Sequence, residues 1–296
     1  MDSGISANRT ENRPPVEAGM TIRSLFSVIG LEPLELRILL EHAIGFSRVK
    51  LVTHSDHCLT VEQAKALSEV VSRRLGGEPI AYITGKREFY GLSFAVTPDV
   101  LIPRPETELL VELAMERLPE KGRLVDLGTG SGAIAIAIAS MRPDADVSAT
   151  DVSEKALNVA THNALALLNG RQTVRFSQGN WFDAIQGQQK ESFDLIVSNP
   201  PYIDSGDEHL KKGDLRFEPA SALTDHADGL AALRILVSGA PDYLKENGWL
   251  LMEHGYDQSE AVRAMLAGRG FANVQSWKDL AGIERVSGGI WKISSK

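Results

Sequence analysis

The residues with the clearest chemical potential are Asn199-Pro200-Pro201-Tyr202, which follow an apolar segment at residues 194–198. Two consecutive prolines fix two φ angles and remove two backbone N–H donors, and a proline pushes the residue before it towards an extended conformation. We therefore expect a rigid rim on which the Asn199 side-chain oxygen and the Pro200 carbonyl accept hydrogen bonds. A planar NH₂ group has two donors for such a rim. The pattern predicts a site that aims an amide or aromatic amine nitrogen at an electrophile, with Tyr202 packed over the substrate or facing a cation.

A glycine-rich segment, Asp126-Leu127-Gly128-Thr129-Gly130-Ser131-Gly132, closes an apolar run that begins at residue 123. Glycine lets the backbone turn tightly and approach a ligand closely. In a doubly wound sheet the loop after the first strand lines the ligand crevice, so we interpret Gly128, Thr129, Gly130, Ser131 and Gly132 as cofactor-binding residues. The segment alone does not identify the cofactor, because Gly128, Gly130 and Ala133 also fit the G-x-G-x-x-A pattern of dinucleotide-binding proteins.

Two further strand ends carry candidate cofactor ligands. Asp151 ends the second strand of this region, 21 positions after Gly130. An acidic residue at that place can accept both ribose hydroxyls of an adenosine, whether the cofactor is a nicotinamide dinucleotide or S-adenosylmethionine. Asn180 and Trp181 follow the third strand, where an adenine would lie. Asn180 can bond the edge of the adenine, and Trp181 either flanks the ring or belongs to the core.

An alternation of strand and helix patterns positions these residues. Strands are predicted at residues 123–127, 147–150, 174–176, 195–198 and 249–252, and helices at 106–118, 133–140, 153–168, 229–244 and 258–267. Alternating elements of this length predict a parallel sheet with helices on both faces. The expected fold class is therefore a doubly wound, Rossmann-like α/β domain, in which the strand ends meet at one edge.

The sequence predicts four regions. Residues 1–19 mix charges and prolines without an apolar run and are expected to form a disordered leader, with Met20 as an alternative start. Residues 20–78 have helical periodicity and are expected to form a small helical domain. Residues 79–102 are rich in β-formers, such as Tyr82 and Ile83, and predict a β-hairpin connector. Residues 103–296 form the α/β domain.

The composition argues against several classes of protein. Residues 1–100 carry 11 basic and 12 acidic side chains, and residues 101–296 carry 20 and 27. Neither part has the basic excess expected of a protein that binds many phosphates. The single cysteine, Cys58, excludes an intramolecular disulfide, and with His54 and His57 nearby it still lacks a fourth metal ligand, so no metal site is expected. The sequence contains no apolar run of the roughly 18 residues that span a membrane and no signal-peptide pattern, so we expect a cytoplasmic protein.

Several segments are distinctive in combination. They are Gly77-Glu78-Pro79-Ile80, Thr84-Gly85 with Arg87-Glu88-Phe89, Ile102-Pro103-Arg104-Pro105-Glu106-Thr107-Glu108, the glycine segment, Asn199-Pro200-Pro201-Tyr202, and Arg216-Phe217-Glu218-Pro219. Asn-Pro-Pro-Tyr alone is shared with other amino-methylating enzymes. Together with Ile-Pro-Arg-Pro-Glu-Thr and Phe-Glu-Pro it is far more specific. Over nearly everything after the leader, the chain resembles the peptide-chain release factor glutamine methyltransferases, the HemK/PrmC family.

The resemblance implies S-adenosylmethionine-dependent N5-methylation of the glutamine in the Gly-Gly-Gln motif of bacterial class 1 release factors. It implies a helical N-terminal domain that helps to hold the release factor, and it favours a monomer. The glycine loop and Asp151 would bind the cofactor, with Trp181 near its adenine, while Asn199, Pro200, Pro201 and Tyr202 would hold the substrate amide. Asn180 stands where many relatives have an acidic residue, which leaves its adenine contact open.

Three other functions remain to be weighed. A nucleic-acid adenine-N6 methyltransferase suits the same rim, but the acidic balance opposes it. A nicotinamide dehydrogenase would use the glycine loop but has no need of the Asn-Pro-Pro-Tyr rim. A non-catalytic cofactor-binding partner of the translation machinery would not need that rim intact. The segment at residues 104–108 is interpreted either as a pocket wall or as a stiff joint.

Overall fold

A computed structural model describes residues 16–168, 170, 174–187 and 190–292, and the chain divides into two compact units between Thr84 and Gly85. Of the predicted leader, residues 1–15 lie outside the described residues. Residues 16–19 belong to the folded part of the smaller unit. Val16 packs against its core, and the Gly19 N–H donates to the Leu59 carbonyl at 2.9 Å. The predicted leader therefore extended too far along the chain.

The smaller unit is helical. Its helices are α1 (Ile22–Val28), α2 (Pro33–Ile44), α3 (Arg48–Thr53), α4 (Val61–Leu75) and α5 (Ile80–Thr84). Helix α4 begins with a capping box in which Thr60 and Gln63 bond each other's backbone N–H groups. Leucines at helical spacing, such as Leu36, Leu39 and Leu40, are fully buried in one core. No helix in the described parts of either unit is long and apolar enough to cross a bilayer.

The prediction for residues 79–102 is wrong at its start. Residues 80–84 form helix α5, and the hairpin consists of β1 (Lys86–Phe89) and β2 (Leu92–Ala95). The N–H groups of Tyr82 and Ile83 bond the Pro79 carbonyl, and Ile83 packs into the core of the smaller unit. Burial of these β-forming side chains on a helical turn outweighs their weak intrinsic preference for strand.

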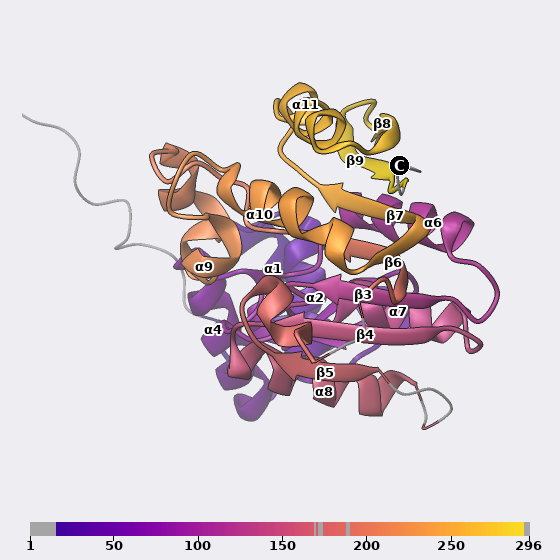
Figure 1. Cartoon of the computed structure of the whole chain (residues 1–296). Coiled ribbons are helices and arrows are strands. Elements are labelled where there is room, and N and C mark those ends of the chain that lie inside the picture. Colours follow the sequence, from indigo (N-terminus) through magenta and orange to yellow (C-terminus); the bar gives the residue numbers. More distant parts are fainter. Residues whose placement is uncertain (1–15, 169, 171–173, 188–189, 293–296) are drawn as a thin grey trace, which may run out of the picture. The chain divides into compact units, whose positions relative to one another are not determined.

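The larger unit contains a seven-stranded sheet in the order β5-β4-β3-β6-β7-β9-β8 (Figure 1). The parallel strands are β3 (Arg123–Leu127), β4 (Asp146–Asp151), β5 (Arg175–Gln178), β6 (Phe193–Ser198) and β7 (Leu244–Glu253). The strands β8 (Ala272–Lys278) and β9 (Glu284–Ile290) add antiparallel pairing at one edge. The described sheet is therefore mixed rather than wholly parallel.

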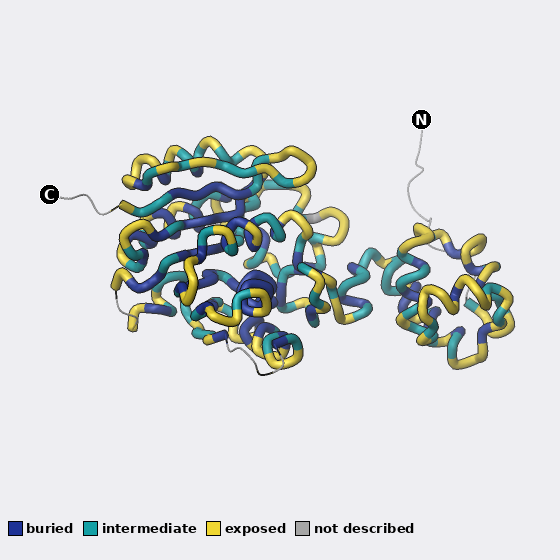
Figure 2. The backbone as a smooth tube through the Cα atoms, turned by 90° about the vertical axis from the view of Figure 1, so that its right-hand side faces the viewer, coloured by how far each residue is buried: buried dark blue, intermediate teal, exposed yellow. Residues whose placement is uncertain are grey.

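Helices cover both faces of this sheet. The α-helices are α6 (Glu108–Arg117), α7 (Ala133–Met141), α8 (Glu154–Leu167), α9 (Ala220–Leu223), α10 (Ala231–Gly239) and α11 (Ser259–Arg269). The 3₁₀ helices are η1 (Pro105–Thr107), η2 (Trp181–Ile185), η3 (Glu208–Lys211), η4 (Gly213–Phe217) and η5 (Ala240–Asp242). One core joins α6 and α7 to the sheet, and a second joins α10 and α11 to its other face. The central strands are consequently buried along most of their length (Figure 2).

The sequence did not predict β8 and β9. Gly288 and Gly289 lie within β9, and glycine weakens the sequence signal of a strand. The structure gives a steric reason for Gly288, because a Cβ there would lie 2.4 Å from the Leu250 carbonyl oxygen of β7. The close approach of the β7 and β9 backbones therefore requires glycine at position 288. The same glycine weakens the sequence pattern from which β9 could have been predicted.

The strand order places the chemistry-bearing residues together. After β3 the chain adds β4 and β5 on one side of it and then returns to add β6 on the other side. The strand order therefore reverses at β3. Ligands bind at such a switch point, outside the carboxyl ends of the strands. The glycine loop follows β3, Asp151 ends β4 and Asn199 follows β6, so all three lie at this edge.

Candidate functional site

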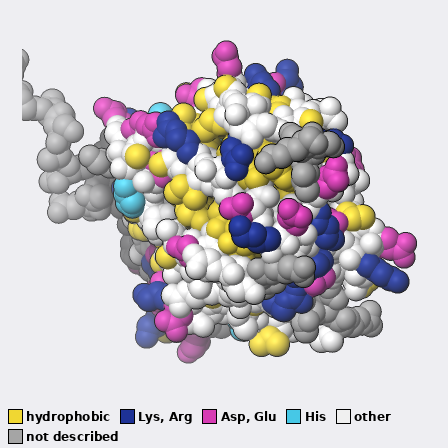
Figure 3. All heavy atoms as spheres, viewed as in Figure 1, with side chains coloured by type: hydrophobic (Ala, Val, Ile, Leu, Met, Phe, Trp, Pro, Cys, Tyr) yellow, Lys and Arg dark blue, Asp and Glu magenta, His cyan; other side chains and the backbone are white. Residues whose placement is uncertain are grey.

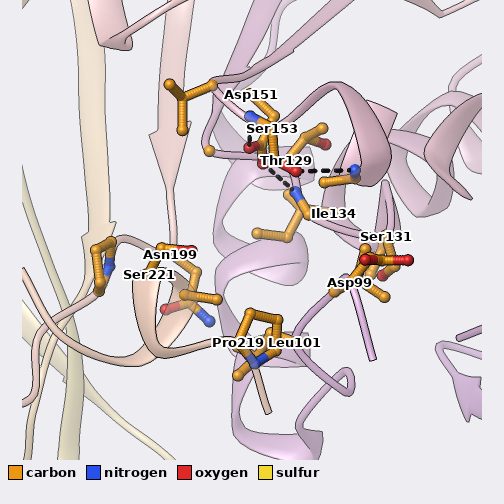
Figure 4. Close-up of a pocket in the computed structure, with 18 of the residues that line it drawn as sticks. Asp99, Leu101, Thr129, Ser131, Ile134, Asp151, Ser153, Asn199, Pro219 and Ser221 are labelled. Atoms are coloured by element: carbon orange, nitrogen blue, oxygen red, sulfur yellow. Dashed lines mark hydrogen bonds between the residues drawn. The ribbon is translucent and has the colours of Figure 1, made fainter. Parts of the chain in front are cut away.

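A pocket at the carboxyl ends of the parallel strands brings most of the predicted site residues together. Its lining includes Gly128, Thr129, Gly130, Ser131, Asp151, Gly179, Asn180, Trp181, Asn199 and Pro201. In Figure 4, Asp151 lies towards one end, whereas Asn199, Leu101 and Pro219 lie towards the other. Of the predicted site residues, Gly132, Pro200 and Tyr202 are not among the described lining residues, although their neighbours are.

The glycine loop is shaped by backbone conformations that favour glycine. Gly128, Gly130 and Gly132 have φ values of +79°, +55° and +82°. A Cβ on Gly132 would lie 2.7 Å from Ile136 Cδ1 and 3.1 Å from Ala160 Cβ. The loop therefore enters α7 in a turn with no room for a side chain at Gly132.

Asp151 binds the backbone of this loop beside the pocket. Its Oδ2 accepts from the Gly130 N–H, and its Oδ1 accepts from the Ser153 N–H, both at 2.9 Å. Burial raises the pKa of Asp151, and these hydrogen bonds oppose the rise. Because each carboxylate oxygen can accept more than one hydrogen bond, both retain capacity for a ligand's hydroxyl groups.

Asp126 supports the loop from beneath, a role that the sequence analysis did not assign. Its side chain is fully buried, and its Oδ2 accepts from the Thr129 hydroxyl at 2.6 Å. Loss of contact with water raises the pKa of Asp126 to about 7, against the effect of the Thr129 bond. The hydrogen bond fixes the Thr129 side chain at the start of the loop.

Trp181 and Asn180 form another part of the wall. They follow β5, where the Gly179 N–H donates to the Asp151 carbonyl at 3.0 Å. A Cβ on Gly128 would lie 3.3 Å from the Trp181 ring, so the ring rests directly against the glycine loop. Trp181 also packs against the second core of the sheet, so the pocket and the core share this side chain.

Asn199 and Tyr202 are each held by a side-chain hydrogen bond. The Asn199 Nδ2 donates to Thr107 Oγ1 at 3.1 Å, and the Tyr202 hydroxyl donates to Glu253 Oε1 at 3.2 Å. Burial and the nearby Glu253 raise the pKa of Tyr202 far above its usual range, so it stays protonated. The Ser198 hydroxyl ties the start of the rim to the Leu127 carbonyl at 2.6 Å.

Glu253 is a site residue that sequence reasoning missed, and Thr107 was predicted only as part of the segment at 104–108. Thr107 lies in η1 and lines the pocket, and Glu253 is fully buried at the end of β7. Asp151 was predicted because an acidic residue ends an apolar strand there. Glu253 has the same position after residues 249–252 and could have been predicted in the same way. No signal predicted the contact of Thr107 with Asn199, because the two residues lie 92 positions apart in the chain.

A buried carboxylate joins the two distinctive segments at residues 102–108 and 216–219. Glu218 has a fully buried side chain that forms an ion pair with Arg104. Its Oε2 also accepts from the Ile102 N–H at 3.1 Å. Arg104 and Pro219 both line the pocket, so the segment at 104–108 forms pocket wall, one of its two predicted interpretations.

A buried amide ties the hairpin to the same loop. Asn163 of α8 accepts from the Ala95 N–H at 2.8 Å and donates to the Ala95 carbonyl at 3.0 Å. Its Nδ2 also donates to the Ser131 carbonyl at 2.9 Å. Nothing in the local sequence of α8 identified this residue, because its partners lie outside the helix.

Comparisons with known proteins agree on one family. Residues 21–85 match the PrmC N-terminal domain, and residues 105–223 match the methyltransferase small domain. The chain is 51% identical over 268 residues to a release factor glutamine methyltransferase of Neisseria gonorrhoeae, covering 90% of this chain and 97% of that protein. A release factor glutamine methyltransferase of Burkholderia pseudomallei is 50% identical over 274 residues, covering 91% and 95%. A solved methyltransferase from Pyrococcus furiosus, 22% identical with a TM-score of 0.52, covers 76% of this chain and 100% of its own and shares the fold.

The buried Glu218 contact generates a stability prediction. Replacing Glu218 by Ala leaves the Arg104 charge and the Ile102 N–H without their partner, so we expect the free energy of unfolding to fall by about 2 to 4 kcal/mol. Urea unfolding followed by tryptophan fluorescence measures this, because all four tryptophans lie in the larger unit. Glu208→Ala is the matched control, since its ion pair with Lys212 is exposed. Equal effects of the two substitutions would contradict the prediction.

Proposed function

The chain belongs to the family of release factor glutamine methyltransferases, and we propose that it methylates the side-chain amide nitrogen, N5, of the glutamine in the Gly-Gly-Gln motif of bacterial class 1 release factors. S-adenosylmethionine supplies the methyl group as an electrophile bound to its sulfonium. The observation that carries the proposal is that Asn199, on the rim after β6, shares one pocket with the glycine loop and Asp151.

The residues present fit S-adenosylmethionine. The loop at 128–132 turns without side chains at its glycines, which gives a ligand close access to the backbone. Asp151 retains acceptor capacity for ribose hydroxyls, and Trp181 offers a flat wall for adenine. We assign cofactor binding to Gly128, Thr129, Gly130, Ser131, Gly132, Asp151, Asn180 and Trp181, with Asn199 at the boundary between cofactor and substrate.

The substrate amide is assigned to the rim. The Asn199 Oδ1 and the Pro200 carbonyl each accept one N–H of the glutamine NH₂, and we assign Pro201 and Tyr202 to the same substrate site. The amide nitrogen is a poor nucleophile because its lone pair is conjugated. Fixing both N–H bonds directs that electron pair towards the methyl group, a contribution of orientation and electrostatics. The nitrogen becomes strongly acidic as it gains the methyl group and releases a proton to water, so no general base is assigned.

Charge supports a protein substrate over nucleic acid. Residues 101–296, which contain the pocket, carry 20 basic and 27 acidic side chains. On the face in Figure 3, Lys and Arg side chains are interspersed with Asp and Glu rather than gathered in one basic area. A nucleic-acid adenine methyltransferase would need a basic channel for the phosphate backbone. We therefore propose that the enzyme acts without direct contact with nucleic acid. From the family resemblance, we also propose a monomeric cytoplasmic enzyme whose helical domain, residues 20–78, helps to hold the release factor.

Replacement of Asn199 tests the substrate rim. Asn199→Ala removes an acceptor that holds the reacting amide, so we expect turnover to fall by more than about tenfold. The initial rate of methyl incorporation into a purified, unmethylated release factor measures the change. Asn158→Ala, an exposed position on α8, is the matched control and is expected to keep the wild-type rate. Near-normal turnover of Asn199→Ala would remove this residue from the reaction.

Replacement of Asp151 tests the cofactor end of the pocket. Asp151→Ala loses a charged acceptor for the ribose hydroxyls and is expected to raise the S-adenosylmethionine Kd by about tenfold or more. Titration calorimetry measures the affinity, and thermal unfolding checks that the variant is folded. Glu154→Ala removes an exposed carboxylate nearby and is expected to leave the Kd unchanged. An unaltered affinity in Asp151→Ala would exclude Asp151 from the cofactor site.

A further inference from the structure

Thr107 is bonded to Asn199, Glu253 lies next to Thr107, and the proposed function gives neither a role. Thr107 is 5% exposed and Glu253 is 1% exposed, so both are shielded from water. The Thr107 Oγ1 accepts a hydrogen bond from Asn199 Nδ2 at 3.1 Å. Glu253 lies beside the same hydroxyl, which favours the ionised carboxylate, as does the hydroxyl of Tyr202. Glu253 therefore adjoins Thr107, Thr107 adjoins Asn199, and both Thr107 and Asn199 line the pocket.

A side-chain amide has an oxygen that accepts hydrogen bonds and an NH₂ group that donates them. Asn199 can present Oδ1 to the pocket and Nδ2 to Thr107, or the reverse. Only Oδ1 can accept from the NH₂ group of a glutamine, because Nδ2 is itself a donor. The orientation of this amide therefore decides whether the rim can hold the substrate.

Thr107 has one hydroxyl proton, and its direction sets the orientation of Asn199. If the proton points to Glu253, the Thr107 oxygen can only accept from Asn199, and Nδ2 must face it. If the proton points to Asn199 instead, the amide turns and presents its NH₂ group to the substrate. The direction of the Thr107 hydroxyl proton therefore decides whether Asn199 presents an acceptor or a donor to the NH₂ group of the substrate.

The surroundings of Glu253 direct that proton towards the carboxylate. Its Oε1 accepts from the Tyr202 hydroxyl at 3.2 Å, whereas its Oε2 is buried and has no hydrogen-bond partner among the described residues. A buried carboxylate oxygen without a donor is strongly unfavourable. The Thr107 hydroxyl is the neighbouring group that can relieve this.

We propose that Glu253 and Thr107 are positioning residues that orient the Asn199 side-chain amide, so that its oxygen faces the substrate glutamine. The inference rests on the proposed function and adds to it the reason why the rim accepts hydrogen bonds. Glu253 acts on Thr107, and Thr107 acts on Asn199. Neither positioning residue touches the reacting nitrogen.

The arrangement also depends on pH. A protonated Glu253 donates to the Thr107 oxygen, which frees the Thr107 proton for Asn199 Oδ1 and turns the amide. Burial raises the pKa of Glu253 to about 7, with Glu106 also raising it and Thr107, Tyr202 and Arg285 lowering it. The ionised carboxylate is the form that orients Asn199 correctly, so activity falls as the pH drops through this pKa.

A pair of substitutions at Thr107 separates orientation from packing. Thr107→Val keeps the shape without the hydroxyl, and Thr107→Ser keeps the hydroxyl with less packing. We expect Thr107→Val to lower kcat/KM for the release factor by about tenfold or more, and Thr107→Ser to stay within about threefold of the wild type. The S-adenosylmethionine Kd, measured by calorimetry, is expected to stay within about twofold in both, which also shows that they are folded. A merely structural role predicts the opposite order, so a more active Val variant, or equal losses, would overturn the proposal.

The pH profile and Glu253→Gln supply an independent readout. The glutamine amide donates to Thr107 as a protonated carboxyl does, so Glu253→Gln is expected to have a low kcat/KM that no longer falls between about pH 8 and pH 6. The wild type and Thr107→Ser are expected to keep this acidic limb. A Glu253→Gln variant with wild-type activity and the same limb would overturn the relay alone. A wild-type enzyme that binds S-adenosylmethionine but leaves the release factor unmethylated would overturn the proposed function and the relay with it.

Discussion

The carboxyl ends of the parallel strands meet at one edge of the sheet, and the site depends on this geometric constraint. The glycine loop, Asp151 and Asn199 lie far apart in the sequence but follow strands that are neighbours in the order β4-β3-β6. The Ser198 hydroxyl bond to the Leu127 carbonyl holds the ends of β6 and β3 together. The cofactor loop and the substrate rim therefore keep a fixed separation, which a transfer between two bound groups requires.

Buried polar side chains beneath the pocket then fix each loop individually. Asp126 holds Thr129, Glu218 holds the segment at 102–104, and Asn163 holds the carbonyl of Ser131. Burial of such groups is costly unless they are hydrogen-bonded, so each loop loses a favourable contact if it moves. Rigidity of this kind suits a reaction in which the protein contributes orientation and the cofactor contributes the reactive bond.

Much of this arrangement could be predicted from the sequence, and the remainder depends on contacts between distant segments. Strand-and-helix alternation predicted the helix-covered sheet, and strand-end positions predicted that Gly128, Asp151 and Asn199 would meet. Helix α5 was missed because its β-forming side chains are buried by packing that no local pattern reports. The edge strand β9 was missed because the close approach of β7 requires glycine there. The contacts of Thr107 and Asn163 were not predicted, because only the fold brings their partners to them. Glu253 ends an apolar strand, as Asp151 does, but was not singled out.

Methylation of a protein glutamine in this pocket can be observed directly. The measurement is mass spectrometry of an unmethylated class 1 release factor after incubation with the protein and S-adenosylmethionine. We expect a gain of one methyl group on the glutamine of the Gly-Gly-Gln motif. An unmodified glutamine, in the presence of demonstrated cofactor binding, would contradict it.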